Sequence, residues 1–337
     1  MTERLRIGFI GCGAFATGTI WPCLRYAPIE VAYACARRPE RAERNAKTFG
    51  AEQATTDVDR VLADESVRAA FVVGPLDMQH EIGVRVLEAG KHLFVEKPPG
   101  SSLRHALDLQ EAASRGGVEC LVAFQKRFAV AYRMAREAAA REEFGGVRLC
   151  KVNYSHWLQP DWREHLTMMS VHPLDLVRFF MGNPSEAHIL KRGSPDGRNT
   201  LVMTALYDSG ASAVVNMSAS DPHVQEWVEL SGANQLISVR NLIEYRHVHA
   251  AGDYSVSHKR NEAAVSGWHP EFAIPYRQAD SMWLQGYAGE VVEFATAILE
   301  GRPVESSIAD GVAAMRYVEA IEAAPEGVSR LDLESFG

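Results

Sequence analysis

A glycine-rich turn close to the start of the chain constrains the fold more than any other feature. The apolar run 5–10 is followed at once by the motif G-x-G-x-x-A at Gly11, Gly13 and Ala16. In a βαβ unit of this kind the first glycine permits a tight turn, and the second lets the backbone approach a pyrophosphate. The alanine lets the helix pack against the strand, with the helix N-terminus facing the anion. The motif therefore predicts a dinucleotide site, with Ala14 and Phe15 in the first helical turn.

Strand-like and helix-like segments alternate through the first 123 residues. Apolar runs predict strands at 5–10, 30–36, 69–73, 92–95 and 118–123. Amphipathic segments between them predict helices at 14–26, 39–49, 58–63, 77–89 and 101–115. Pro22 is expected to kink or shorten the first helix, and Asp77 to cap the fourth. This alternation predicts an α/β fold, a Rossmann domain with a doubly wound parallel sheet over residues 1–123.

The pattern changes in residues 124–337. Alternating runs separated by turn residues predict strands at 147–157, 187–191, 201–207, 212–219, 225–231 and 235–240. Helices are predicted at 127–141, 171–181, 289–299 and 308–323, and residues 251–285 are expected to form a long ordered loop. Short turns between strands favour antiparallel pairing. We therefore expect a second, α+β domain at 124–337 with a large, mostly antiparallel open sheet.

Composition excludes several classes of protein. The 35 basic and 43 acidic residues give a net charge of −8, which argues against nucleic acid as a partner. No apolar run approaches the roughly 18 residues that a membrane span needs. Five cysteines without a C-x-x-C pair fit a reducing compartment better than a disulfide framework. With no room for a signal peptide before residue 7, the expected location is the cytoplasm.

The end of the second predicted strand bears on the choice of cofactor. An NAD site usually has a carboxylate there to hold the ribose 2′-hydroxyl, but this strand runs into Arg37 and Arg38. Guanidinium groups bind a 2′-phosphate well, so the sequence favours NADP, with NAD as the alternative. The competing interpretation is that both arginines begin a solvated basic helix face with Arg41 and Arg44.

A lysine follows the fifth predicted strand, in the segment Glu96-Lys97-Pro98-Pro99. Loops at the carboxyl ends of parallel strands line the ligand crevice of such a sheet. Lys97 there is suited to polarise a carbonyl or share the proton of an alcohol. Glu96 is placed to orient the ammonium group, and the Lys97–Pro98 bond is a candidate for the cis form.

Several motifs together resemble the Gfo/Idh/MocA family of glucose–fructose oxidoreductases, inositol dehydrogenases and their relatives. They are the glycine motif and the segments 74–80, 88–98, 125–128 and 299–303. The resemblance implies NAD(P)-dependent chemistry at a secondary alcohol or keto group, and a homo-oligomer formed through the C-terminal sheet. It also implies that Lys97 contacts the reacting hydroxyl, and it adds cofactor contacts at Gly74, Pro75, His80, Glu96 and Lys97 itself.

Members of this family typically carry D-x-x-x-H-x-x-D on a helix of the second domain. His172 and Asp175 match that pattern, but Met168 replaces the first aspartate. Residues four apart on an α-helix share a face, so Met168 is expected to point towards the same site as His172. Methionine cannot exchange a proton, which leaves His172 as the expected acid/base group. Asp175 is expected to orient the imidazole or bind substrate.

The segment before that helix is rich in aromatic and charged residues. Further substrate contacts are expected at Arg127, Trp157, Trp162, Arg163 and His165. Trp268, His269, Tyr276 and Trp283 are candidates to close over the substrate. The histidine spacing fits no familiar metal pattern, so no metal is expected.

The sequence thus predicts an NADP-preferring oxidoreductase for a sugar, a cyclitol or a related compound. One alternative is a catalytically silent NAD(P)-binding sensor, which the loss of the aspartate at Met168 favours. Another is a dehydrogenase of a non-sugar cyclic diol or hemiacetal, for which the aromatic segment leaves room.

Overall fold

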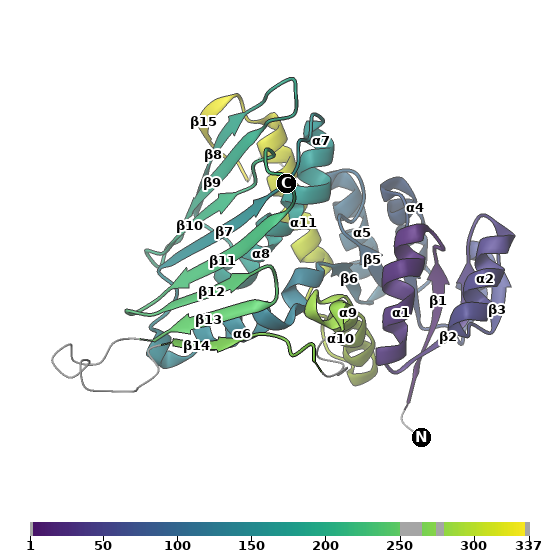
Figure 1. The fold of residues 1–337 in the computed structure, drawn as a ribbon. Helices are drawn as coiled ribbons and strands as arrows, with labels where there is room; N and C mark the ends of the chain where they lie inside the picture. Colours follow the sequence, from purple (N-terminus) through teal and green to yellow (C-terminus); the bar gives the residue numbers. More distant parts are fainter. Residues whose placement is uncertain (1–2, 250–264, 274–279, 334–337) are drawn as a thin grey trace. The chain divides into compact units, whose positions relative to one another are not determined.

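The computed structural model describes residues 3–249, 265–273 and 280–333. The chain divides into two compact units (Figure 1). Unit 1 comprises Met1–Gln125 and Gly286–Arg316, and unit 2 comprises Lys126–Gln285 and Tyr317–Gly337. The first boundary lies close to the one expected at residue 123. The expected second domain, 124–337, includes residues 286–316, whereas in the structure these residues belong to unit 1.

Unit 1 is built on a six-stranded sheet in the order β3-β2-β1-β4-β5-β6, and every neighbouring pair is parallel. The strands are β1 (Leu5–Ile10), β2 (Ile29–Cys35), β3 (Gln53–Thr55), β4 (Ala69–Val72), β5 (His92–Glu96) and β6 (Cys120–Ala123). Most of their residues are buried, because helices cover both faces of such a sheet. The doubly wound α/β prediction is confirmed.

The helices of unit 1 are α2 (Pro39–Phe49), α3 (Val58–Ala63), α4 (Leu76–Glu88), α5 (Leu103–Gly116) and α10 (Tyr287–Glu300), with the start of α11 (Ile308–Ala323). One predicted detail is wrong. Pro75, not Asp77, precedes α4, and Asp77 instead accepts a hydrogen bond from Ser101 Oγ at 2.8 Å. The first helix is not regular: a π-helix (η1, Ala16–Ile20) precedes α1 (Trp21–Cys23) and the 3-10 turn η2 (Leu24–Tyr26). Pro22 explains the irregularity, since it has no N–H for the α-helical ladder.

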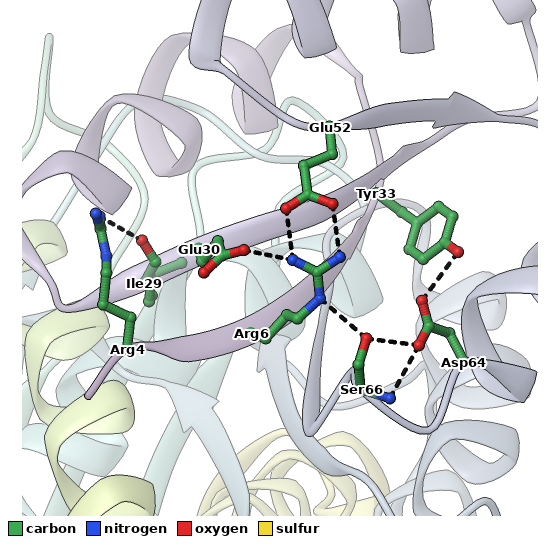
Figure 2. A network of polar contacts seen from close by, with 8 residues as sticks. All are labelled: Arg4, Arg6, Ile29, Glu30, Tyr33, Glu52, Asp64 and Ser66. Carbon is green, nitrogen blue, oxygen red and sulfur yellow. Dashed lines mark hydrogen bonds and ion pairs between the residues drawn. The ribbon is translucent and has the colours of Figure 1, made fainter.

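A polar network joins β1, β2 and the loop before β4 at the amino-end edge of this sheet (Figure 2). Arg6 bonds both carboxylate oxygens of Glu52 at 2.5 and 2.6 Å and also pairs with Glu30. Its Nε donates to Ser66 Oγ at 2.9 Å, and Ser66 in turn donates to Asp64. The Arg6 guanidinium lowers the pKa of Glu52 to about 2. The network therefore connects β1 and β2 to the segments that precede β3 and β4.

Unit 2 contains a nine-stranded sheet in the order β14-β13-β12-β11-β7-β10-β9-β8-β15 (Figure 1). Its strands are β7 (Leu149–Ser155), β8 (Glu186–Arg192), β9 (Thr200–Leu206), β10 (Ser212–Asn216), β11 (Gln225–Ser231), β12 (Leu236–Arg240), β13 (Glu244–Val248), β14 (Val265–Trp268) and β15 (Gly327–Arg330). Among these described strands, only β7 and β10 pair in parallel. The predicted large, mostly antiparallel sheet is confirmed.

Helices pack on one face of the nine-stranded sheet. α8 (Val171–Met181) lies against β7 and β10, and α6 (Val130–Ala139) lies against β12 and β13. Alternate residues of each strand are buried on that side, as in the pattern of β11. The remaining elements are η4 (Glu142–Phe144), α7 (Trp162–Glu164), the π-helix η5 (His165–Ser170) and α9 (Ser281–Leu284).

The long ordered loop expected at 251–285 contains a strand, β14, and a helix, α9, among its described residues. β14 carries Trp268, and α9 carries Trp283. Tyr276 lies outside the described residues. Nowhere in the described part of the chain is a helix long and apolar enough to cross a membrane.

Candidate active site

A pocket of about 290 Å³ opens in unit 1 at the carboxyl ends of β1, β2 and β4. Its walls include Gly11, Gly13, Gly74 and Pro75, all predicted as cofactor contacts. In an open parallel sheet, ligands bind at this edge, where the strand order reverses. β1 and β4 are the strands at that reversal here.

The backbone of the glycine turn explains why its residues are small. Gly11 has a φ of +133°, and a Cβ added there would lie 2.0 Å from the carbonyl oxygen of Val73. A Cβ on Gly13 would meet no atom within 4 Å, so its backbone borders open space. Ala16, the first residue of η1, is buried. Gly11 thus forms the turn and Gly13 leaves room for a ligand, as the motif predicts.

Three arginines contribute to the pocket wall. Arg37 and Arg38 follow β2, and Arg41 lies in the first turn and a half of α2. Among the described residues, no carboxylate lines this pocket. The arrangement suits a ligand with negative charge near the end of β2.

Several predicted cofactor contacts are not among the residues that line the pocket: Ala14, Phe15, Ala16, His80, Glu96 and Lys97. His80 lies outside the pocket lining: its Nε2 is 3.0 Å from Asp108 Oδ2, and its ring stacks on His105 with centroids 3.8 Å apart. Phe15 is exposed and meets the Tyr287 ring edge to face. The geometry of unit 1 thus gives His80 a role in joining α4 to α5.

Lys97 directly follows β5, and the Lys97–Pro98 bond is cis. Glu96, the last residue of the strand, is buried, and its Oε2 accepts a hydrogen bond from the backbone N–H of Lys97 at 3.2 Å. Burial raises the pKa of Glu96 to about 7, although the nearby Lys97 charge opposes the shift. A cation and a readily protonated carboxyl group are therefore adjacent at the end of β5.

In unit 2, Arg127 and Asp175 bond to each other. Arg127 Nε donates to Oδ2 at 2.7 Å and Nη2 to Oδ1 at 2.5 Å, and both side chains are buried. Arg178, one turn along α8, lies 3.9 Å from the same carboxylate. This two-bond geometry fixes α8 to the segment before α6. Both residues were predicted as substrate contacts, and each already has a charged partner.

His172 is buried in the first turn of α8, whereas Met168 is 43% exposed. Met168 belongs to the π-helix η5. The expectation that Met168 and His172 share a helical face assumes α-helical spacing, which does not apply across a π-helix. The tilted rings of His172 and Tyr154 have centroids 5.7 Å apart.

His165 is enclosed within unit 2. Its Nε2 lies 2.7 Å from the carbonyl oxygen of Met217, and its ring is stacked by Trp162 with centroids 5.3 Å apart. Burial lowers the pKa of His165 to about 4, so the ring is neutral at physiological pH. A fully buried neutral imidazole is typical of a packed core residue.

The other aromatic and basic candidates of this segment differ in exposure. Trp162 carries the ammonium group of Lys191 over its ring at 5.3 Å, and Arg163 pairs with Glu322. Trp157 is 48% exposed and is therefore accessible to a ligand. The described residues contain no group of three His, Cys, Asp or Glu side chains that would hold a metal ion.

The sequence did not single out Cys12 and Thr56, which also line the pocket, or Glu290, a buried carboxyl on α10. Cys12 lies inside the glycine motif, so its position was a usable signal. Thr56 and Glu290 come from segments with no motif, and only the folded chain places them.

The parallel sheet, the glycine turn and the pocket at its carboxyl edge are those of a Rossmann domain that binds a dinucleotide. Residues 5–124 match the model of the oxidoreductase family with an NAD-binding Rossmann fold, and residues 132–238 match the GFO/IDH/MocA C-terminal domain. The chain belongs to the Gfo/Idh/MocA oxidoreductase family.

Individual relatives agree with this assignment. The chain is 24% identical to the uncharacterized oxidoreductase YrbE of Bacillus subtilis, covering 96% of this chain and 94% of the relative. It is 26% identical to scyllo-inositol 2-dehydrogenase (NAD(+)) of Bacillus subtilis, with 81% and 82% covered. A dehydrogenase structure from Chromobacterium violaceum has the same fold, with a TM-score of 0.85 and 23% identity over 96% and 95% of the two chains.

Proposed function

We propose that this protein is an NADP-preferring oxidoreductase that transfers hydride between the nicotinamide and a secondary alcohol or keto group of a sugar or cyclitol. The observation that carries the cofactor preference is the wall formed by Arg37, Arg38 and Arg41, with no carboxylate among the described lining residues. A carboxylate would hold a free ribose 2′-hydroxyl, whereas guanidinium groups bind a 2′-phosphate. The name of the inositol-dehydrogenase relative supports a polyol substrate.

Two side chains are proposed to handle the proton. Lys97, at the end of β5, polarises the substrate oxygen and stabilises negative charge on it during hydride transfer. His172 accepts the hydroxyl proton in oxidation and returns it in reduction, since an imidazole titrates near neutral pH. The nicotinamide cofactor supplies the hydride acceptor or donor. Exposed Trp157 is proposed to stack on the substrate ring.

The two arginines after β2 provide the test of cofactor preference. Replacing both in an Arg37→Ala/Arg38→Ala variant should weaken NADPH binding about 10- to 100-fold, because bonds to a charged phosphate are lost. NADH binding should change little. Titration of the nicotinamide fluorescence measures both affinities.

Arg115→Ala provides a matched control for the arginine variant, since Arg115 is an exposed arginine of α5 in the same unit. The control should bind both cofactors as the wild type does. Equal affinity of the wild type for NADH and NADPH would contradict the proposed preference.

One observation favours a second function, an NAD(P)-binding sensor without turnover. Met168 stands where the family motif carries an aspartate, and a thioether cannot transfer a proton. Lys97 and His172 are both present, which supports the enzyme. Cofactor binding without any redox change across many polyols and keto sugars would favour the sensor, whereas turnover of a cyclic diol or hemiacetal alone would favour a non-sugar dehydrogenase.

We also infer that the chain forms a homo-oligomer through the open face of its nine-stranded sheet. Leu206, Val214 and Val328 are exposed apolar residues on β9, β10 and β15. Exposed apolar patches of this kind mark interaction surfaces. Sedimentation equilibrium should give a multiple of 37.2 kDa, and a monomer at micromolar concentration would contradict the inference.

A further inference from the structure

Two carboxyl groups are buried together in unit 1. Glu96 is the last residue of β5, and Glu290 lies in the first turn of α10. Glu290 is 0% exposed and Glu96 is 7% exposed. Glutamate is almost never buried to this degree unless it has a partner, so the pair requires a physical explanation.

Neighbouring aromatic residues fix how these side chains face each other. Phe94 precedes Glu96 by two residues on the same side of β5, and Phe294 follows Glu290 by four on the same face of α10. The rings of Phe94 and Phe294 meet edge to face with centroids 5.8 Å apart. From this ring contact, Glu96 lies two residues further along β5 and Glu290 lies one turn back along α10. The two carboxyl groups therefore lie opposite each other. The Glu96 charge accordingly acts on Glu290.

The hydrogen bonds of this pair are incomplete. Glu96 Oε2 accepts from the backbone N–H of Lys97, but within the described residues Glu96 Oε1 and both oxygens of Glu290 have no hydrogen-bond partner. Three buried acceptors facing one another without a donor are costly. A proton on one carboxyl group would convert it into a donor to the other.

Few other charges act on the pair. The nearby Lys97 charge lowers the pKa of Glu96, and Lys97 directly follows the strand that Glu96 ends. On α10, Glu293 is already held by Arg302 at 2.7 and 2.8 Å, and on η2 Arg25 bonds Tyr26. β4 contributes apolar residues alone, and burial keeps the Cys120 thiol of β6 neutral by raising its pKa.

We propose that Glu290 carries a proton that it shares with Glu96, and that Glu290 is in this way a positioning residue for Lys97. The shared proton leaves one negative charge on the pair, next to the lysine at the end of β5. One negative and one positive charge can be buried together more easily than two carboxylates. The role for Lys97 rests on the proposed function, whereas the shared proton does not.

The pKa values support this arrangement. Burial raises the pKa of Glu96 to about 7, and burial together with the Glu96 charge raises the pKa of Glu290 well above its ordinary value. The titration steps belong to the pair. The folded chain therefore holds protons that the unfolded chain releases near pH 4.5. It should lose stability as the pH rises from there through 7 and beyond.

Infrared spectroscopy of the full chain without cofactor tests the shared proton directly. At pH about 8, where ordinary carboxyl groups are ionised, the wild type should show the carbonyl band of one protonated carboxylic acid. Glu290→Gln should remove that band, and Glu300→Gln, at an exposed carboxyl of the same helix, should keep it. Absence of the band from the wild type, or its persistence in Glu290→Gln, would overturn the proposal.

Activity tests the positioning role. Glu290→Leu removes the donor to Glu96, so the acidic limb of the kcat/KM profile should move up by about one pH unit. Glu290→Gln keeps a donor and should return the limb to its wild-type position. A wild-type profile in Glu290→Leu would contradict the role for Glu290. If the wild type turned over no substrate, the proposed function would fail while the infrared result still decided the shared proton.

Discussion

A Lys97→Met variant is expected to lose about 10²- to 10⁴-fold in kcat while binding NADPH as the wild type does. Methionine preserves the length of the side chain but removes the cation that stabilises charge on the reacting oxygen. The dinucleotide pocket is formed by other residues, at the ends of β1, β2 and β4. Steady-state kinetics and fluorescence titration of the cofactor measure the two properties separately.

Lys47→Met is the matched control for the lysine variant. Lys47 is an exposed lysine near the end of α2 in the same unit, so its replacement should leave kcat unchanged. Turnover of Lys97→Met within about twofold of the wild type would remove Lys97 from the mechanism, because even modest acid–base or electrostatic roles exceed that difference.

An Arg127→Met variant is expected to lower the free energy of unfolding by about 3–5 kcal/mol. Asp175 is 1% exposed, so without Arg127 its charge remains buried with Arg178 3.9 Å away. A double variant, Arg127→Met/Asp175→Leu, should recover most of the loss, because it leaves neither charge uncompensated. Urea unfolding of the single and double variants measures the difference.

Arg192→Met serves as a control for the buried pair, since Arg192 is exposed at the end of β8. It should change stability by less than about 0.5 kcal/mol. If Arg127→Met were equally mild, or if the double variant lost as much as the two single variants combined, the pair would not stabilise α8 as described.

The parallel sheet of unit 1 was predictable because its signals are local. A glycine turn after an apolar strand, followed by alternating segments, permits few other folds. The helix details depended on contacts that a pattern does not contain. The π-helix before Pro22 is one such detail, and the hydrogen bond that Asp77 accepts from Ser101 Oγ in place of capping α4 is another.

The edges of the sheet in unit 2 were not predicted, for a physical reason. In β13 the inward positions are Tyr245 and His247, so the strand lacks the usual apolar alternation. His247 Nε2 lies 2.8 Å from Oε1 of Gln235, which directly precedes the neighbouring strand β12. The sequence pattern does not reveal this partner. β15 has four residues and joins the far edge only through pairing with β8.

The parts of the candidate site that lie within short sequence motifs were predictable, and the parts that depend on residues distant in sequence were not. The pocket residues Gly11 and Gly13 and the lysine at the end of β5 follow from the order of strands and loops. Arg127 and Asp175 bond across 48 residues of sequence, and Glu290 reaches Glu96 only because α10 returns to unit 1. Charges whose partners are distant in sequence resemble solvated surface residues until the chain has folded.

We propose that this chain oxidises or reduces a sugar or cyclitol with NADP as its preferred cofactor. The most direct measurement is the absorbance of the reduced nicotinamide when the purified protein is mixed with NADP+ or NAD+ and a panel of polyols and sugars. We expect turnover with at least one cyclitol or aldose, and a higher kcat/KM with NADP+ than with NAD+. Tight cofactor binding without turnover of any panel member, in either direction, would contradict the claim.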